Sequence, residues 1–486
     1  MIMDENSRDP GSETRRAKIV CTLGPACDTP EKLAALLDAG MEVARLNFSH
    51  GTHLEHARRL RVLRRLARQR GRILAVLQDL QGPKIRTGLL EEGQPVELKQ
   101  NSQVTLTTRP VRGNARLIST DFRLLPREVR PESRILLSDG RIELRVERIS
   151  GRDILCRVIE GGELGEHQGI NLPGLTLNIP ALTTKDREDL GFAVREGVDY
   201  IALSFVRSPE DILELRRWLA RAGREIPVVA KLEKPQAIDR LEEILNVADA
   251  VMVARGDLGV ELPPESVPVM QKRIIARANA LKVPVIVATQ MLESMTEHSR
   301  PTRAEASDVA NAIFDGADAL MLSTETATGR YPVEAVRMMA RIISAAEGSP
   351  RYAWYRRRPF ADEEVTVPEG IGQSVAYLAE ELNLKAIAVF TQSGSSARLV
   401  SKYRPRVPVF AFSPLPQILR RTALYWGVEP IHMPRVQSTD RMVEGAAHLL
   451  RARGVVRPGD LIAVVAGTPI ARRGTTNLLK VHRVEK

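Results

Sequence analysis

Residues 227–259 read PVVAKLEKPQAIDRLEEILNVADAVMVARGDLG, and this stretch decides the fold. A β-rich run over 228–232 comes first, an amphipathic helical segment with apolar residues at 238, 241, 244 and 245 follows, and a second β-rich run covers 250–254. This order is typical of one βαβ unit, in which both strands are parallel and finish at the same edge of a sheet.

Charged residues leave both strands of this unit at that edge. Lys231 and Glu233 end the first strand, and Asp257 follows the second. Two carboxylates suit a Mg²⁺ ion that keeps some water and takes its other ligands from a phosphorylated substrate, and a lysine suits the charge of a phosphoryl group in transfer. A structural salt-bridge cluster would give the same pattern, so these residues alone leave both interpretations open.

Length and composition indicate a globular protein of several domains. The chain has 486 residues, 43% hydrophobic and 27% charged, and the usual length prior gives about three domains. No apolar run approaches the roughly 18 residues that a membrane span needs, and the N-terminal segment lacks the apolar core of a signal peptide. We therefore expect a cytoplasmic protein with no membrane partner.

The cysteines do not indicate a disulfide framework or a zinc site. Cys21, Cys27 and Cys156 form no CxxC pair and have no partnering histidine cluster. We expect them to be buried thiols.

The positive net charge is compatible with nucleic acid or with small anionic substrates. Lysine and arginine number 71 against 60 acidic residues, which gives +11. The densest basic segment, 57–72, places its arginines three or four residues apart, on one face of a predicted helix. A solvated helix face is the simpler interpretation, and 4% aromatic residues leave little for base stacking. We expect no nucleic-acid partner.

The order of elements along the chain predicts a (β/α)₈ barrel. After a tail over 1–16 that we expect to be mobile, strand-like and helix-like segments alternate, with a helix start at Thr183 or Thr184 and a last helix over 332–347. The predicted strands are 17–24, 41–51, 72–88, 200–206, 227–233, 250–259, 283–290 and 319–326. Eight strand–helix pairs imply a closed TIM barrel built from residues 17–88 and 170–348.

Two further domains accompany the barrel. Residues 89–169 contain short β-like runs and no convincing amphipathic helix, which predicts a small β-rich insertion. Its place after the third strand would let it close over the catalytic edge as a lid. After a linker that begins at 349, helix and strand alternate again, so 349–486 is predicted to be a second α/β domain.

In a barrel of this kind the active site lies at the C-terminal ends of the strands. The strand bodies here are apolar, and polar residues gather where the strands end. These residues are Arg45, Asn47, Ser49 and His50, then Asp79, Lys84 and Arg86, then Ser204 and Arg207, then Lys231, Glu233, Asp257, Thr289, Ser323 and Glu325.

The sequence resembles the pyruvate kinase family over nearly its whole length. The segments that carry the resemblance are VARLNFSHG (43–51), LTTKDREDL (182–190), VVAKLEK (228–234), MVARGDLGVELP (252–263), VIVATQMLESM (285–295), RPTRAEASDVANAIFDGADALMLSTETATGRYP (300–332) and GTTNLLKVH (474–482). The resemblance implies a barrel with a β-rich lid domain and a C-terminal α/β regulatory domain. It also implies phosphoryl transfer from phosphoenolpyruvate to ADP, which gives pyruvate and ATP as the final step of glycolysis, in a homotetramer.

The resemblance assigns roles to the residues of the βαβ unit. It makes Glu233 and Asp257 the protein ligands of Mg²⁺, for which Mn²⁺ could substitute, and gives Lys231 the task of neutralising the migrating phosphoryl group. Backbone groups around Gly256 and Asp257 would bind the substrate carboxylate. Thr289 would lie near the methylene carbon, and because a threonine hydroxyl is a poor acid we expect it to relay a proton through water.

Three basic residues outside this unit receive roles from the same resemblance. Arg45 would hold the phosphate of phosphoenolpyruvate, and Arg86 with Lys185 would meet the phosphates of ADP or ATP.

At the monovalent-cation region the sequence departs from the best-known family pattern. The resemblance places that region at Asn47, Ser49, Asp79 and Leu80. K⁺-dependent members carry Thr-Lys-Gly-Pro-Glu where residues 80–84 here read LQGPK, so Lys84 replaces a glutamate. We expect its ammonium to supply the charge that K⁺ otherwise brings, and K⁺ not to be required. Thr87, retained from the K⁺-dependent pattern, keeps the opposite interpretation open, in which Lys84 points to solvent.

A serine-rich loop in the last domain predicts a regulatory phosphate site. Residues 391–398 read TQSGSSAR, and they set hydroxyl groups around Gly394 between a β-run and a predicted helix. The hydroxyl residues are Thr391, Ser393, Ser395 and Ser396. The loop resembles the effector loop of regulated family members, with Arg472 or Arg473 as possible counter-charges, and an ordinary capped helix start is the alternative. The sequence does not identify the phosphorylated effector.

Two other functions are weighed against a pyruvate kinase. A different barrel enzyme that uses a Mg²⁺-bound enolate, such as a lyase or aldolase acting on pyruvate, would need no nucleotide and would leave Lys185 and Arg86 without a purpose. A non-catalytic nucleic-acid-binding relative would be expected to lose Lys231, Glu233 or Asp257, and all three are present.

Overall fold

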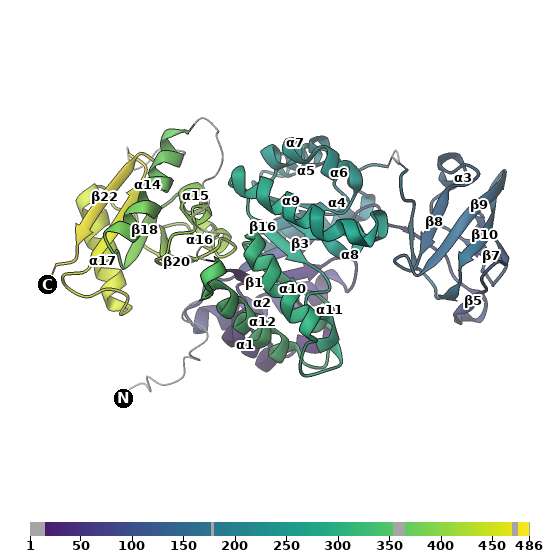
Figure 1. Ribbon diagram of the computed structural model, residues 1–486, viewed down its shortest axis with the longest axis horizontal. Helices are drawn as coiled ribbons and strands as arrows, with labels where there is room; N and C mark the ends of the chain where they lie inside the picture. The colour runs from purple at the N-terminus through teal and green to yellow at the C-terminus, as the bar shows by residue number, and fades with distance from the viewer. Residues whose placement is uncertain (1–14, 176–178, 353–364, 469–474, 486) are drawn as a thin grey trace.

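The computed structural model describes residues 15–175, 179–352, 365–468 and 475–485. Three bodies lie in a row along the long axis of the molecule (Figure 1). The barrel is in the middle, with a β-rich body at one end and the C-terminal α/β body at the other.

Eight parallel strands close into a barrel, in the order β1-β17-β16-β15-β14-β13-β3-β2. Their bounds are β1 Lys18–Thr22, β2 Val43–Asn47, β3 Ala75–Asp79, β13 Tyr200–Leu203, β14 Val228–Leu232, β15 Ala250–Ala254, β16 Val285–Ala288 and β17 Ala319–Leu322. The predicted (β/α)₈ barrel is therefore confirmed, and each strand is shorter than the β-rich segment that predicted it.

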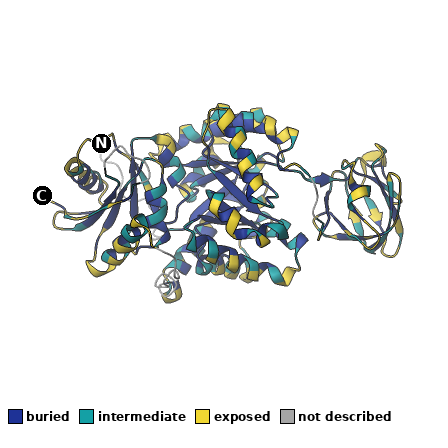
Figure 2. Cartoon of the chain, turned by 90° about the horizontal axis from the view of Figure 1, so that it is seen from above, coloured by how far each residue is buried: buried dark blue, intermediate teal, exposed yellow. Residues whose placement is uncertain are grey.

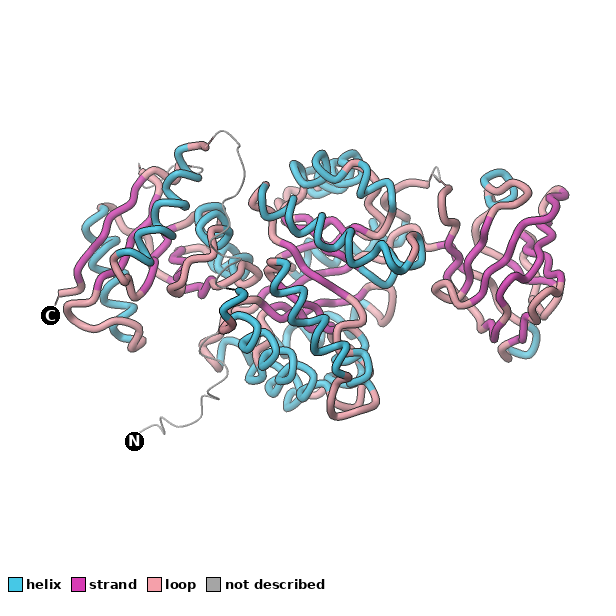
Figure 3. Tube along the Cα trace, viewed as in Figure 1, coloured by secondary structure: helices cyan, strands magenta, loops and turns pink. Residues whose placement is uncertain are grey.

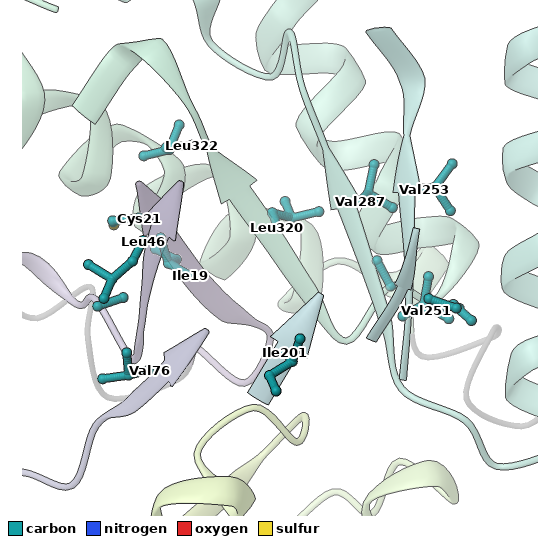
Figure 4. Packing of buried hydrophobic residues seen from close by; sticks show 14 of the residues in the cluster. Ile19, Cys21, Leu46, Val76, Ile201, Val251, Val253, Val287, Leu320 and Leu322 are labelled. Carbon is teal, nitrogen blue, oxygen red and sulfur yellow. The ribbon is translucent and has the colours of Figure 1, made fainter. Parts of the chain in front are cut away.

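Side chains of the barrel strands alternate between two apolar clusters. Ile19 and Cys21 of β1 belong to the cluster that includes the surrounding helices, whereas Val20 belongs to the cluster of the barrel interior. Figure 4 shows the first set, with Ile19 and Cys21 near Leu46 of the neighbouring strand. Because both faces of each strand are covered, the strands read as continuous apolar runs.

The barrel helices surround the strands (Figure 3). Their bounds are α1 Pro30–Ala39, α2 His53–Gln69, α4 Thr184–Glu196, α5 Pro209–Arg221, α6 Pro235–Asp239, α7 Leu241–Val247, α8 Arg255–Glu261, α9 Val267–Ala280, α10 Arg303–Asp315, α11 Thr324–Ala327 and α12 Pro332–Glu347. Thr183 caps α4, since its hydroxyl accepts a hydrogen bond from the Asp186 backbone while the Asp186 carboxylate accepts from the Thr183 backbone.

Two features of the 227–259 stretch differ from the prediction. The expected single helical segment is broken into α6 and α7 at Arg240, whose backbone is not helical (φ −105°, ψ 27°) and whose side chain pairs with Glu210 and Glu243. In addition, Gly256 and Asp257 lie in the first turn of α8. Residues 255–257 therefore turn directly from strand into helix.

The β-rich body holds a seven-stranded sheet, β4-β12-β8-β9-β10-β6-β7, and a two-stranded sheet, β11-β5. Its elements are β4 Ile85–Arg86, β5 Val96–Leu98, β6 Gln103–Thr107, β7 Leu117–Ser119, α3 Leu125–Glu128, β8 Arg134–Leu137, β9 Ile142–Ser150, β10 Asp153–Glu160, β11 Gly162–Leu164 and β12 Gly169–Asn171. β4 and β12 pair with each other at the end nearest the barrel, so this sheet reaches a few residues beyond the predicted bounds of 89 and 169. The chain enters this body through β4 and leaves it through β12. Because these two segments pair as strands, the sheet begins before residue 89 and ends after residue 169.

The C-terminal body is a five-stranded sheet in the order β20-β19-β18-β21-β22, with only the β21–β22 pair antiparallel. Its elements are α14 Val367–Glu381, β18 Ala386–Phe390, α15 Ser395–Lys402, β19 Val409–Ser413, α16 Pro416–Thr422, β20 Val428–His432, α17 Thr439–Ala452, β21 Leu461–Ala466 and β22 Leu478–Arg483. The apolar cluster of the barrel interior continues into this body. Figure 2 shows both sheets as buried layers beneath partly exposed helices.

Several smaller expectations can be compared with the described residues. Of the expected mobile tail, residues 1–14 lie outside them, whereas Arg15 pairs with Glu42 and Arg16 donates to the Val407 carbonyl, so its last two residues are fixed. The basic face of α2 is exposed, as predicted, and the cysteines are free and buried. No described helix has the length and apolar character to cross a membrane.

Candidate active site

Lys231 lies at the centre of a buried charge cluster near the C-terminal end of β14. Its Nζ is 2.9 Å from Glu233 Oε1 and 3.3 Å from Asp79 Oδ1, and it donates a 2.8 Å hydrogen bond to Ser204 Oγ. The four residues come from the ends of β3, β13 and β14, which neighbour one another in the barrel. Because parallel strands end at the same edge of the barrel, the polar residues at their C-terminal ends are brought together.

Arg45 extends the cluster from β2. Its Nε is 2.6 Å from Asp79 Oδ2, and its terminal nitrogen donates to Thr22 Oγ1 at 2.9 Å. Asp79 thus has a guanidinium on one oxygen and an ammonium near the other. The sequence analysis assigned Asp79 to the monovalent-cation region and did not predict its pairing with Arg45. Asp79 lies opposite Asn47 on the adjacent strand, and Arg45 is two residues before Asn47, so the strand register could have indicated this pairing.

The cluster keeps its central pair charged. Burial alone would raise the pKa of Asp79, but the Lys231 ammonium and the Arg45 guanidinium outweigh it and lower the pKa. Burial alone would lower the pKa of Lys231, but the Asp79 and Glu233 carboxylates outweigh it and raise the pKa. The pKa of Glu233 is raised, because burial and the nearby Asp257 carboxylate outweigh the effect of Lys231.

The two predicted metal ligands lie near each other and keep acceptor capacity on their carboxylates. Glu233 Oε2 accepts a hydrogen bond from the Phe205 backbone, and its Oε1 faces the Lys231 ammonium at 2.9 Å. The Asp257 carboxylate is partly exposed, and its nearest cation is Lys84, 4.0 Å away. Among the described residues no group of three or more acidic, histidine or cysteine side chains could hold a metal. Two carboxylates with open positions fit a Mg²⁺ that takes its remaining ligands from substrate and water.

Thr289 follows β16 and contacts the first turn of α8. Its Oγ1 accepts a 2.8 Å hydrogen bond from the Gly256 backbone and donates to the Ala288 carbonyl at 2.6 Å. Thr289 has φ of 70°, a backbone conformation that a β-branched residue rarely adopts. Such strain is common at functional sites, and it aims the hydroxyl at the Gly256–Asp257 turn.

The two predicted nucleotide-binding residues lie on different elements. Arg86 of β4 donates to the His167 carbonyl at 2.9 Å, in the β-rich body. Lys185 of α4 pairs with Asp189 at 2.6 Å and donates to the Phe48 carbonyl at 2.7 Å, while its side chain is 47% exposed. Among the described residues no contact joins Lys185 to Arg86. Asp189 was missed by sequence reasoning, although its i,i+4 spacing from Lys185 was a signal.

The structure places Lys84 away from the predicted monovalent-cation region. Its Nζ is 3.6 Å from Asp139 and 4.0 Å from Asp257, and no ion pair or hydrogen bond in the described part of the chain joins it to Asp79, Asn47 or Ser49. Asp79 is already paired with two cations, and the side chain of Lys84 lies against the backbone of Gly169 in β12. The expectation that Lys84 reaches in between those residues is therefore not met.

The other members of that region satisfy one another. Asn47 Oδ1 accepts from the Ser49 backbone at 3.2 Å, and the Leu80 carbonyl accepts from Ser204 Oγ at 2.7 Å. Thr87 is buried, and its hydroxyl accepts from the Gln168 backbone at 2.9 Å. The retained threonine therefore has a structural partner between the two bodies.

The serine-rich loop lines a pocket at the start of α15 that is open to solvent. Thr391 Oγ1 accepts from the Gly394 backbone, Ser393 and Ser395 share a 2.9 Å hydrogen bond, and Ser396 bonds to Thr476. The same pocket is lined by Arg435, a basic residue that sequence reasoning missed because it lies in a different loop. Arg472 and Arg473 lie outside the described residues.

Comparison with known proteins gives one consistent result. Residues 14–336 match the family model described as pyruvate kinase, barrel domain, and residues 369–482 match pyruvate kinase, alpha/beta domain. The chain is 46% identical over 477 residues to pyruvate kinase 2 of Synechocystis, covering 97% of this chain and 80% of that protein. It is also 46% identical over 471 residues to pyruvate kinase of Geobacillus stearothermophilus, with 96% and 80% covered.

A solved structure agrees with these sequence matches. The crystal structure of a pyruvate kinase from Cryptosporidium parvum superposes with a TM-score of 0.91 at 37% identity, covering 98% of each chain.

Proposed function

The chain belongs to the pyruvate kinase family, and we propose that the cluster around Lys231 is its catalytic centre. The protein is a phosphotransferase that transfers the phosphoryl group of phosphoenolpyruvate to ADP and forms pyruvate and ATP. The observation that carries the site is the buried ammonium of Lys231, held between Asp79 and Glu233 beside the carboxylate of Asp257.

Glu233 and Asp257 hold the Mg²⁺ that the family uses, and Mn²⁺ can take its place. The bound ion supplies positive charge to the phosphoryl oxygens and the developing enolate. This assignment is supported by the nearness of the Glu233 carboxylate to Lys231 at the mouth of the barrel and by the exposed side of Asp257. With the ion bound, Glu233 is the carboxylate form, although burial raises its pKa in the free protein.

Lys231 and Arg45 bind the phosphoryl group from the protein side. Lys231 stays protonated because two carboxylates face it, so its charge is in place before the reaction and costs no rearrangement during it. Arg45 is oriented by Asp79 and Thr22, which leaves part of its guanidinium for the phosphate of phosphoenolpyruvate.

Backbone groups at Gly256 and Asp257 hold the substrate carboxylate, and Thr289 is the nearby hydroxyl for proton delivery. The Gly256 backbone donates a 2.8 Å hydrogen bond to Thr289 Oγ1, which keeps this wall close to the hydroxyl. The Thr289 hydroxyl donates to the Ala288 carbonyl and would orient a water, which would give one of its own protons to the methylene carbon and regain a proton from solvent.

Arg86 and Lys185 meet the phosphates of ADP. Arg86 belongs to the sheet of the β-rich body and Lys185 to a barrel helix, so a nucleotide held by both joins the two bodies. This would draw the lid over the phosphates and exclude water from the transfer.

Turnover does not require a monovalent cation. The support is the ammonium of Lys84 at 4.0 Å from Asp257, which is a fixed positive charge at the barrel mouth, together with the Arg45 and Lys231 charges around Asp79. K⁺ independence is thus proposed as predicted from the sequence, but with the Lys84 ammonium beside Asp257 and not between Asp79, Asn47 and Ser49.

The protein works as a cytoplasmic homotetramer. Within each chain, the serine loop binds a phosphorylated activator. The loop offers hydroxyl groups, the start of α15 and Arg435 around one pocket. Ser395→Asp should abolish activation, seen as loss of the shift in the phosphoenolpyruvate saturation curve across a panel of sugar phosphates and nucleotides. If no compound shifts the curve of the parent, the loop has no such role.

A coupled assay tests the activity itself. Pyruvate formation is followed with lactate dehydrogenase and ATP formation with hexokinase and glucose 6-phosphate dehydrogenase, in parallel samples. Equal amounts of both products are expected, and both require ADP. Pyruvate formation without ADP would indicate a lyase or phosphatase instead, and the absence of both products would remove the proposed function.

A further inference from the structure

The last residue of α8 joins the β-rich body to the barrel. Glu261 ends this helix, and its side chain is only 3% exposed. Its Oε1 accepts two hydrogen bonds, one from Asn171 Nδ2 at 3.2 Å and one from Lys234 Nζ at 2.5 Å. Asn171 belongs to β12 of the β-rich body, and Lys234 follows β14 of the barrel. One buried carboxylate oxygen therefore has a donor from each body.

Helix α8 lies at the end of the barrel that faces the β-rich body (Figure 1). The turn between β8 and β9 also reaches this helix, since Gly140 lies against Val260. Lys84 approaches the start of the same helix, but its ammonium is 4.0 Å from Asp257 and both side chains are partly exposed. The hydrogen bond from β12 to Glu261 is better shielded from water, and a buried hydrogen bond is electrostatically stronger than an exposed one.

Both barrel residues of this contact are next to the residues proposed to hold Mg²⁺. Lys234 directly follows Glu233, and Glu261 lies four residues after Asp257 on the same short helix. A spacing of four residues puts Asp257 and Glu261 on one face of α8. A displacement of Glu261 is therefore also a displacement of the helix that carries Asp257.

A second contact connects Lys234 with the carboxylate of Glu233. The Lys234 ammonium lies 5.7 Å from the centre of the Phe205 ring, within the range of a cation–π interaction. The Phe205 backbone donates at 2.7 Å to Glu233 Oε2, and its φ of 55° is one that a bulky residue rarely adopts. Lys234 thus lies over the residue whose strained backbone orients the Glu233 carboxylate.

The burial of Glu261 gives these contacts their strength. A carboxylate that is out of water and then loses a donor keeps its desolvation penalty without the compensating interaction. Movement of β12 away from α8 would leave Glu261 with Lys234 as its partner and without Asn171. The arrangement in which β12 stays beside α8 is therefore favoured.

We propose that Glu261 is a positioning residue that couples the lid to the metal site, through Asn171 on the lid side and Lys234 on the barrel side. The proposal rests on the proposed roles of the β-rich body as a lid and of Glu233 and Asp257 as metal ligands. When the lid closes over a nucleotide, the hydrogen bond from Asn171 carries the movement of β12 to α8. The coupling is reciprocal, so a helix that is fixed at Asp257 also holds β12 in place.

Hydrogen–deuterium exchange of the full chain, without metal or substrate, tests the coupling. Asn171→Ala removes only the lid side of the contact, and the backbone amides of α8 should then exchange about threefold faster or more. Asn114→Ala is the matched control, because the Asn114 amide donates at 3.0 Å to Glu91 within the β-rich body, and here α8 should exchange as in the parent. An unchanged α8 in Asn171→Ala would overturn the proposal, and this result is independent of the proposed activity because no turnover is involved.

Steady-state kinetics test the consequence for the reaction. Asn171→Ala should raise the KM for ADP about fivefold or more and leave the KM for phosphoenolpyruvate within about twofold, because ADP meets Arg86 of the lid whereas phosphoenolpyruvate is held by the barrel. Glu261→Gln keeps an acceptor for Asn171 and loses the charge that faces Lys234. Its KM for ADP should therefore stay near that of the parent, while the Mg²⁺ needed for half-maximal activity rises about threefold or more.

A double variant shows whether the two residues act through each other. Glu261→Ala removes the acceptor, so the addition of Asn171→Ala should change the KM for ADP no further. Effects that multiply in the double variant would mean that the two residues act independently. Equal increases of both KM values in Asn171→Ala would make the contact a general support of the fold. Either result overturns the proposal.

Discussion

Lys231 shows how a single residue is prepared for catalysis. Lys231 is 9% exposed, and burial alone would lower its pKa because burial penalises the charged form. Here Asp79 and Glu233 outweigh that penalty, and the pKa of Lys231 is raised. The ammonium is therefore charged across the whole physiological pH range and needs no proton transfer before each turnover.

Lys231→Ala should lower kcat by about a thousandfold or more, because a charge aimed at the migrating phosphoryl group acts chiefly in the transition state. The KM for phosphoenolpyruvate should change far less, since Arg45 still binds its phosphate. Steady-state kinetics measure both quantities, with Lys272→Ala on the exposed surface of α9 as the control. A kcat within tenfold of the parent would remove Lys231 from this role.

Thr289 allows a matched pair of substitutions. Thr289→Ala removes the hydroxyl and should lower kcat by about ten- to a hundredfold, because proton delivery then lacks its relay. Thr289→Ser keeps the hydroxyl and should stay within about threefold of the parent. Tritium uptake from water into pyruvate measures the proton step alone, and equal behaviour of both variants would exclude the hydroxyl from it.

Lys84 decides the cation requirement. The parent should be fully active with K⁺ and NH₄⁺ replaced by a bulky organic cation, provided that Mg²⁺ is present. Lys84→Glu should lower activity and make the remainder respond to K⁺, because the mouth then holds an extra carboxylate beside Asp257 and Asp139. Strong activation of the parent by K⁺ at constant ionic strength would contradict this account.

At the scale of elements, the sequence pattern predicted the features that local residues determine and missed the features that tertiary contacts determine. The eight strands, the Thr183 cap and the bounds of α12 follow from apolar period, capping residues and proline. The break at Arg240 was missed because its cause includes a carboxylate on α5. The reach of Lys84 was missed for the same reason, since β12 and Asp139 of the β-rich body, distant in sequence, fix its direction.

One element joins the barrel to the C-terminal body through a buried ion pair. Lys402, at the end of α15, is 2.5 Å from Asp318, which directly precedes β17, and Arg404 contacts the other oxygen of Asp318 at 3.0 Å. Burial lowers the pKa of Lys402 to about 7, against the opposing pull of Asp318.

This pKa predicts a pH-dependent stability. Between pH 7 and the ordinary value of 10.5, the unfolded chain holds a proton on Lys402 that the folded chain has lost, so raising the pH favours the folded state. Relative to Lys402→Met, in which Arg404 still pairs with Asp318, the parent should gain about 1 kcal/mol per pH unit from pH 7 to 9. Urea unfolding at both pH values measures the difference, and a constant difference would mean that Lys402 keeps its proton.

At the scale of the whole molecule, the barrel is attached differently to its two neighbours. Toward the C-terminal body the apolar interior of the barrel is continuous with the next core, and Tyr200, Lys18 and Arg16 donate hydrogen bonds across the junction. Toward the β-rich body the chain passes through the short strands β4 and β12. The barrel and the C-terminal body are therefore suited to act as one rigid unit that transmits regulation. The β-rich body is suited to move as a lid over the barrel mouth.

The central claim is that Glu233 and Asp257 bind the metal next to Lys231, and the Mg²⁺ dependence of turnover tests it most directly. In the coupled assay, Glu233→Gln should need at least tenfold more Mg²⁺ for half-maximal activity and should reach about a hundredth or less of the parent kcat. Glu265→Gln, outside the site, should match the parent. If Glu233→Gln instead follows the Mg²⁺ curve of the parent with an unchanged kcat, the metal is held elsewhere and the account is wrong.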